Sequence, residues 1–526
     1  MENDSSVTIA SLRQMINFHD SWTHRLPPEI LVVVASYLNH DASLVALTHV
    51  CHLWRVVLIA SPHVWAHLDF ANKLRALMFL KRSESVPLRV DLKGAKTPPG
   101  VMESLDKMAS RVTVLRGEDT SFLANILAHP MPALRTLSIS QVVRGREEIP
   151  LWSPPFPSLT SLVTSGHSFI GFYAPHLTTF HFTYRSCGRF PDGMGNGLLH
   201  FLGSCPLLEV VFLHYGEKYK ALDFWTDDTF SLPRLRSFTH DSSYYEYELG
   251  LFNRFSLPST CQVRFVVKAS ELEGPLDMWT PTLPTIRDPS RLSDTRRISI
   301  GFHIPPSGGR SSHIRFKVKL VRSNNTITSF DRRSDTLPNP SDYSPDRSLV
   351  FLNKIETSSV ETMCFYRFPE CDESAMFQIT RKHIFQGLQK LHNLKTLILS
   401  ECDSTLFFDA LLPCERWCPT VDTLVIQSDQ VSLNFGPGWY DLIDRVQEVA
   451  RLRSEAGSHL KTLILVFRGT GACSMEGTLR KRRAELEQLR NYVGWLEVVA
   501  GDEALTWDIN KYFLGDHDSF LFKSNV

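Results

Sequence analysis

One short phrase recurs along this chain of 526 residues and limits its fold more than any other feature. Each copy begins with a turn residue and continues with the spacing Leu-x-x-Leu-x-Leu or a close variant, as in PALRTLSIS at 132–140 and HNLKTLILS at 392–400. Alternation of apolar and polar residues predicts a half-buried strand. The eight copies begin at residues 132, 157, 175, 206, 233, 392, 419 and 458.

This phrase resembles the strand of a leucine-rich repeat, and the first five copies follow one another at 18 to 31 residues, close to the period of that class. One strand and one helix cannot bury inward residues such as Leu134, Leu137 and Ile139, so stacked neighbours bury them for each other. We therefore expect an irregular α/β leucine-rich-repeat solenoid. The alternative is an unrelated α/β domain whose parallel strands begin after Pro-x-Leu.

The composition narrows the possible partners. Apolar residues make up 43% and charged residues 21%, which excludes wholesale disorder and a fibrous repeat. Lys plus Arg and Asp plus Glu number 56 each, so the formal net charge is zero, which removes the electrostatic argument for a nucleic-acid or membrane-surface partner. The apolar run Ile30–Ala35 is too short to span a bilayer. Ten scattered cysteines without a signal-type leader predict a cytoplasmic and/or nuclear protein.

Changes in pattern divide the chain into segments, and the predicted fold class is α+β overall, with a small all-α module before the solenoid. The segment 271–360 lacks the phrase and is rich in Pro, Ser, Arg and Asp, although HIRFKVKLV at 313–321 alternates like a strand. We expect a weakly ordered lead at 1–21, a helical module at 22–70, a connector of helix and strand at 71–110, the first part of the array at 111–270, an insertion with a hairpin and mobile loops at 271–360, the second part at 361–500 and a tail at 501–526.

The helical module carries a specific order of motifs. Leu26-Pro27-Pro28-Glu29-Ile30-Leu31 is followed by Tyr37-Leu38, then by Val50-Cys51-His52-Leu53-Trp54, and finally by Pro62-His63-Val64-Trp65. This order resembles the F-box, although Val34 stands where that family commonly has Ile. The text FLKRSESVPLRVDL at 79–92 is similar to the segment after the F-box in many basidiomycete fungal F-box proteins. The resemblance therefore covers roughly residues 24–92.

The resemblance implies that the module docks on a Skp-type adaptor and through it on a cullin, while the repeats select a protein for ubiquitination by an SCF-type ligase. A helical module of about 40 residues is marginal alone and gains stability from a partner. Each docking position has plain helix packing as its alternative, and for Val50 and Trp54 the two remain open. The docking positions implied by the resemblance are Leu26, Pro27, Glu29, Ile30, Leu31, Leu38, Leu44, Val50, Cys51 and Trp54.

The alternation of strand residues also predicts a candidate substrate face. If Leu137 and Ile139 point inward, their neighbours point to the opposite face of the sheet. The same registration predicts that Val425 is exposed. This face is neutral and partly aromatic, so it suits a protein segment, or the insertion 271–360 folded over it. The candidate residues are Thr136, Ser138, Thr179, His181, Phe212, His214, Ser237 and Thr239.

Motifs for catalysis, metals and cofactors are weak, so we expect a non-catalytic receptor without a metal or a cofactor. Gly166-x-Ser168-x-x-Gly171 is one residue too long for a nucleophile elbow. Cys402, Cys414 and Cys418 lack the C-x₂-C pairs of a zinc site.

Two other hypotheses and one signal remain open. One is a repeat scaffold that uses its F-box outside ubiquitin transfer, and the other is an enzyme built on the α/β array. The run Arg480–Arg483 matches a nuclear localisation signal, but it also fits the solvated face of a helix lined by Leu479, Leu486 and Val493.

Overall fold

The computed structural model divides into two compact units, described separately below: residues 1–186 with 200–208 form unit one, and residues 187–199 with 209–526 form unit two. The predicted lead at 1–21, apart from residue 11, and the predicted tail at 501–526 lie outside the described residues. The structure describes residues 11, 26–38, 41–92, 108–118, 126–127, 129–140, 156–165, 173–184, 194–215, 229–242, 254–269, 294–303, 314–334, 357–367, 388–400, 407–408, 411, 420–429, 439–468 and 482–500.

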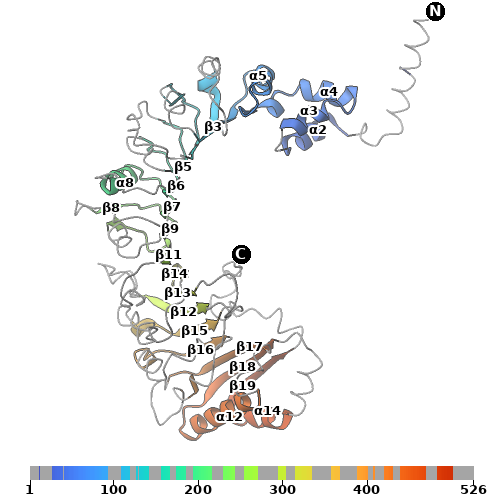
Figure 1. Cartoon of the computed structure of the whole chain (residues 1–526). Coiled ribbons are helices and arrows are strands. Elements are labelled where there is room, and N and C mark those ends of the chain that lie inside the picture. Colours follow the sequence, from blue (N-terminus) through green and yellow to red (C-terminus); the bar gives the residue numbers. More distant parts are fainter. Residues whose placement is uncertain are drawn as a thin grey trace, which may run out of the picture. The chain divides into compact units, whose positions relative to one another are not determined.

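Unit one begins with the predicted short helices, α2 (Pro28–Ser36), α3 (Asp41–Leu47), α4 (His52–Ile59) and the 3₁₀ turn η2 (Pro62–Trp65) (Figure 1). Pro28 occupies the first turn of α2, where a missing N–H costs nothing, and Glu29 lies beside the positive end of the helix. The extended backbone of Cys51 separates α3 from α4. The helices expected in this part of the chain are therefore present.

The helices continue directly into a sheet. Strand β1 (His67–Asp69) pairs in parallel with β2 (Leu88–Asp91), and α5 (Lys73–Arg82) connects them. Asn72 caps α5, because its side chain accepts a hydrogen bond from the backbone N–H of Arg75 at 3.1 Å. The helix and the strand expected in the connector at 71–110 are therefore both present.

Trp65 fills the junction between the helices and the sheet, and its side chain is fully buried. Its indole Nε1 donates to the carbonyl oxygen of Leu58 in α4 at 2.8 Å. Its ring meets Phe79 of α5 edge-on with centroids 4.9 Å apart, and the guanidinium of Arg82 lies 4.5 Å from its ring centroid. One side chain therefore joins α4 to α5.

The sheet of unit one places its strands side by side in chain order, and every neighbouring pair is parallel. Leu137, Leu162 and Phe180 are fully buried, while the residues on either side of each of them in its strand are half-buried. This alternation matches the period of two in the sequence. After β1 and β2 come η3 (Ala109–Arg111), β3 (Val112–Gly117), β4 (Thr136–Ile139), β5 (Ser161–Ser165) and β6 (Thr179–Tyr184). Helix α8 (Met194–Gly203) has residues in both units.

Unit two contains a longer sheet in which all strands except β13 run in one direction. Its spatial order is β7 (Val210–Tyr215), β9 (Ser237–Ser242), β11 (Gln262–Ala269), β14 (Ile327–Ser334), β13 (Ile314–Arg322), β12 (Thr295–His303), β15 (Thr362–Arg367), β16 (Thr396–Ser400), β17 (Thr423–Asp429), β18 (Leu460–Arg468) and β19 (Val493–Ala500). Two short strands, β8 (Phe230–Ser231) and β10 (Phe255–Ser256), pair separately.

All eight copies of the recurrent phrase form strands, as the sequence predicts. The segment 271–360 contains the expected hairpin, β13 and β14, and also β12. These three strands lie within the sheet, between β11 and β15. A short 3₁₀ turn, η9 (Thr357–Ser359), precedes β15.

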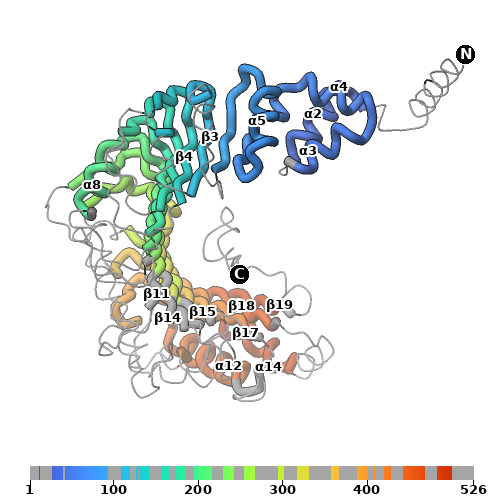
Figure 2. The backbone as a smooth tube through the Cα atoms, turned by 45° about the horizontal axis from the view of Figure 1, so that its top comes forward, coloured from blue at the N-terminus to red at the C-terminus, as the bar shows by residue number. Residues whose placement is uncertain are grey.

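Helices α12 (Trp439–Glu455) and α14 (Arg483–Leu489) lie together beside β17–β19 (Figure 2). Val446 and Val449 of α12 pack in the same cluster as the leucines of β16–β18. The expectation that Val493 lines a helix is wrong, because this residue begins β19. A short run of spaced apolar residues is compatible with a helix or a strand, and here the pairing with β18 makes this segment a strand.

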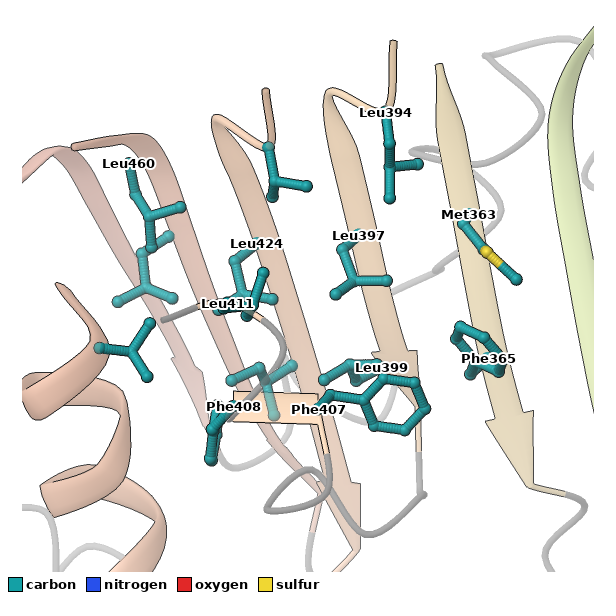
Figure 3. Packing of buried hydrophobic residues seen from close by; sticks show 14 of the residues in the cluster. Met363, Phe365, Leu394, Leu397, Leu399, Phe407, Phe408, Leu411, Leu424 and Leu460 are labelled. Carbon is teal, nitrogen blue, oxygen red and sulfur yellow. The ribbon is translucent and has the colours of Figure 1, made fainter. Parts of the chain in front are cut away.

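The sheet of unit two buries both of its faces between β15 and β18. One face carries a large cluster that includes Leu397, Leu424 and Phe365 (Figure 3). The opposite face carries a second cluster, and its members Ile398 and Val425 are fully buried. The expectation that Val425 is exposed is therefore wrong. In these strands the positions on the second face also hold apolar residues, and their removal from water stabilises the fold.

Arg453 of α12 is a buried cation, only 2% exposed. Its guanidinium donates to the carbonyl oxygens of Leu411 at 3.2 Å, Val421 at 2.6 Å and Ser458 at 3.1 Å. These bonds tie the end of the helix to the segments before β17 and β18. A buried charge is tolerated only when hydrogen bonds replace its lost hydration.

Candidate functional site

Helix α2 has two different apolar faces. Leu31 and Ala35 are buried against the rest of the helical module. Ile30, Val34 and Tyr37 follow one another at helical spacing on the other face and are 44%, 44% and 78% exposed. A polar face would be the norm for a helix on the surface of a small module.

The same feature continues into the turn before α4 and into α4 itself. Val50 is 59% exposed, and Val56 and Ile59 lie one turn apart on the outer side of α4. Arg55 fixes this turn, because its Nε donates to the carbonyl oxygen of Thr48 at 2.8 Å. We call the following set the exposed apolar residues of α2–α4: Ile30, Val33, Val34, Tyr37, Val50, Val56 and Ile59.

The predicted docking positions occupy three environments. Ile30, Val50, Pro27 and Glu29 are exposed. Leu26, Leu38, Cys51 and Trp54 are half-buried, and Leu31 and Leu44 belong to the core. The indole Nε1 of Trp54 is buried, and it has no hydrogen-bond acceptor among the residues that the structure describes. Their role in docking stays a prediction.

The sequence reasoning did not select Val33, Val34, Tyr37, Val56 or Ile59. A signal was present in α2, because apolar residues recur at 30, 33, 34 and 37 as well as at 31, 35 and 38. Two apolar stripes on one helix of nine residues are more than one core can bury. The second stripe indicated a surface for a partner.

The candidate substrate face is half-buried at all eight predicted positions. In unit one, Thr136 pairs through Ser161 with Thr179, and Ser138 pairs through Val163 with His181. Burial lowers the pKa of His181, which favours the neutral form of its imidazole. The register thus brings these residues into two rows.

In unit two, Phe212 lies opposite Thr239, and His214 lies opposite Asp241. The Nδ1 atom of His214 is 3.0 Å from Oδ2 of Asp241, and both side chains are largely buried. Ser237 pairs with Val210 at the start of these strands. These four predicted residues therefore also share one face.

Three free thiols are buried and belong to the interior. Burial raises the pKa of Cys205 to about 11 and that of both Cys261 and Cys364 to about 12. The Ser299 hydroxyl and the Lys319 ammonium offset part of the effect at Cys364. Thiols in this state are poor nucleophiles, because the thiolate is the reactive form.

These pKa values predict an alkaline loss of stability. A raised pKa in the folded chain stabilises it fully below the unfolded value of about 9 and progressively less as pH rises toward 12. In urea unfolding at pH 8 and pH 10, the wild-type chain is expected to lose about 1 kcal/mol more stability than the Cys364→Ala variant. Equal losses for the two chains contradict this prediction.

The remaining motifs fall largely outside the part of the chain that the structure describes. Gly166, Ser168 and Gly171 lie outside the described residues, as do Cys402 and the other two cysteines of that group. Within the described ranges, no group of three or more His, Cys, Asp or Glu residues is placed to hold a metal ion. Among the helices described, none is long and apolar enough to cross a membrane.

The basic run at 480–483 is described only for its last two residues. Arg482 forms ion pairs with Asp444 of α12 and, at 3.3 Å, with Glu485. Arg483 is exposed in the first turn of α14. The localisation signal stays a prediction, since neither observation tests it.

Comparison with known proteins gives one finding for the N-terminal helices. A family model described as F-box-like matches residues 23–71. The match contains α2 to α4, η2 and β1, and therefore all the exposed apolar residues of α2–α4. It covers about a tenth of the chain. No curated protein matches the chain.

Proposed function

We propose that this chain is an F-box protein and that it is the substrate-recognition subunit of an SCF-type cullin-RING ubiquitin ligase. The F-box-like domain supports this assignment. The domain binds a Skp-type adaptor and through it a cullin. The parallel strands that follow, which we interpret as degenerate leucine-rich repeats of a fungal F-box protein, bind the protein to be ubiquitinated. The chain itself is non-catalytic in this proposal and acts in the cytoplasm and/or the nucleus.

The exposed apolar residues of α2–α4 carry the docking half of this proposal. Full burial of a valine, isoleucine or similar side chain gains about 1.5–3 kcal/mol, so seven of them left in water represent a large unused free energy. Exposed apolar patches of this kind mark binding surfaces. Their position inside the F-box-like match supports a Skp-type adaptor as the partner that would cover them.

We expect the double variant Ile30→Asp, Val34→Asp to lose association with a Skp-type adaptor. Both side chains are exposed in the free chain, so the substitutions leave the core intact, whereas two carboxylates in an apolar interface lose hydration without a partner. Affinity measured by titration calorimetry is expected to fall at least about 100-fold, which equals about 2.7 kcal/mol. Leu31 is unsuitable for this test because it belongs to the core.

The variant Leu74→Asp supplies a matched control. Leu74 is 80% exposed in α5 and lies outside the F-box-like match, so the same change of charge there should preserve adaptor affinity. Circular dichroism of all variants checks that they fold. The proposal fails if the wild-type chain does not bind the adaptor, or if the double variant binds as tightly as the Leu74→Asp chain.

A further inference from the structure

The candidate substrate face differs between two parts of the chain. At the middle position of each phrase, Ser138, Val163 and His181 of unit one are half-buried. At the same phrase position in unit two, Ile398 and Val425 are fully buried within an apolar cluster. A partner cannot reach side chains that are already removed from the surface. The strands β4–β6 therefore offer a surface that β16 and β17 do not.

The hydroxyl groups on β4–β6 are available for hydrogen bonds. Among the described residues, the side chains of Thr136, Ser138, Ser161 and Thr179 make no hydrogen bond. They stand in register on neighbouring strands, which lie about 4.8 Å apart. Within the described part of the chain, these hydroxyls are therefore not used in the hydrogen bonding of the fold.

Hydroxyl groups at the starts of the strands have a different role. Thr113 donates to the carbonyl oxygen of Leu88 at 3.0 Å, and Thr178 donates to that of Thr160 at 3.0 Å. These bonds join adjacent strands and use their hydroxyls within the fold. The comparison indicates that the hydroxyls in the middle of the face are not needed to join the strands.

The face on β4–β6 also lacks formal charge. Its described positions hold Ser, Thr, Val163 and His181, while the nearest charged residues on this face, Arg116 and Asp91, belong to β3 and β2. A charged group brought against Val163 and the hydroxyls of β5 and β6 would lose hydration and gain no opposite charge from these two strands, whereas the exposed Arg116 lies in register beside Ser138 at the β4 edge. The charge pattern thus favours an uncharged partner segment over β5 and β6.

We propose that this face of β4–β6 binds an extended, uncharged segment of the substrate protein through hydrogen bonds to its hydroxyls, with a small apolar side chain against Val163. Three strands span about 10–15 Å, which corresponds to about three to five extended residues of the partner. The proposal rests on the proposed function, because it names the chemistry of the substrate that the receptor selects.

The test uses the full chain bound to its Skp-type adaptor and a displayed library of random eight-residue peptides as the probe. We expect enriched peptides whose central positions lack Asp, Glu, Lys and Arg. Their affinity is expected to change less than about twofold between about 50 mM and about 500 mM NaCl, because screening acts on charged pairs. Enrichment of charged centres, a strong salt dependence or the absence of any enriched peptide overturns the proposal.

A matched pair of variants locates the surface. Thr179 and Thr462 hold the same position in the phrase and are both half-buried, but Thr462 belongs to β18 in unit two. Thr179→Asp is expected to weaken binding of an enriched peptide at least about tenfold, whereas Thr462→Asp leaves it unchanged. An equal effect of the two overturns the proposal. Adaptor binding, measured in the same samples, separates this failure from a failure of the proposed function.

Discussion

Trp65→Ala is expected to lower the free energy of unfolding of unit one by about 3–5 kcal/mol, the range for removing a large aromatic side chain from a core. The indole is fully buried between α4 and α5. Its loss leaves a cavity beside Phe79 and removes the hydrogen bond to the carbonyl oxygen of Leu58. The contact between the guanidinium of Arg82 and the indole ring is lost as well. Denaturant unfolding followed by circular dichroism measures the change.

Trp495→Ala provides the control for this prediction. Trp495 lies on β19 and is 63% exposed, so its removal is expected to change stability by less than about 0.5 kcal/mol. Trp65→Phe should cost less than Trp65→Ala, because the ring remains and mainly the hydrogen bond is lost. If Trp65→Ala and Trp495→Ala unfold at the same denaturant concentration, the junction does not depend on Trp65.

Arg453→Leu is expected to destabilise unit two by about 3–6 kcal/mol. The substitution leaves the carbonyl oxygens of Leu411, Val421 and Ser458 without their donor, and each unsatisfied buried group costs about 1–3 kcal/mol. Removal of the buried charge itself recovers part of this cost. Thermal or urea unfolding of the full chain gives the difference.

Arg451→Leu is the matched control on the same helix. Arg451 is exposed, and its partner among the described residues is Glu455 at 2.7 Å, one turn away, so its replacement should cost less than about 0.5 kcal/mol. Arg453→Lys should fall between the two, because an ammonium group cannot reach three carbonyls in the geometry of a guanidinium. A result in which Arg451→Leu and Arg453→Leu are equal refutes the role assigned to Arg453.

The strands were predictable because each recurrent phrase carries its own period and its own turn residue. The position of the three strands β12, β13 and β14 between β11 and β15 was not predictable. It depends on pairing between residues far apart in sequence, and no local pattern encodes that choice. Val493 illustrates a different limit. Its spacing from Leu486 suits a helix, and only the pairing with β18 makes it the first residue of a strand.

The candidate site was predictable in its location and less so in its residues. Ile30 and Leu31 are both large and apolar, and the packing of α2 against α4 and η2 decides that only Leu31 is buried. The burial of the second face of β16 and β17 was indicated by the sequence. The phrases TLILS at 396–400 and TLVIQ at 423–427 hold an apolar residue where TLSIS at 136–140 holds Ser138.

The strand β1 shows that a border drawn by sequence similarity need not be a border of folding. The F-box-like match ends at residue 71, yet β1 within it takes its hydrogen bonds from β2, at 88–91. A fragment cut at residue 71 would leave an unpaired strand edge and expose Trp65, two features that favour aggregation. A transfer of this module to another protein would therefore need to include the first helix and strand that follow it, α5 and β2.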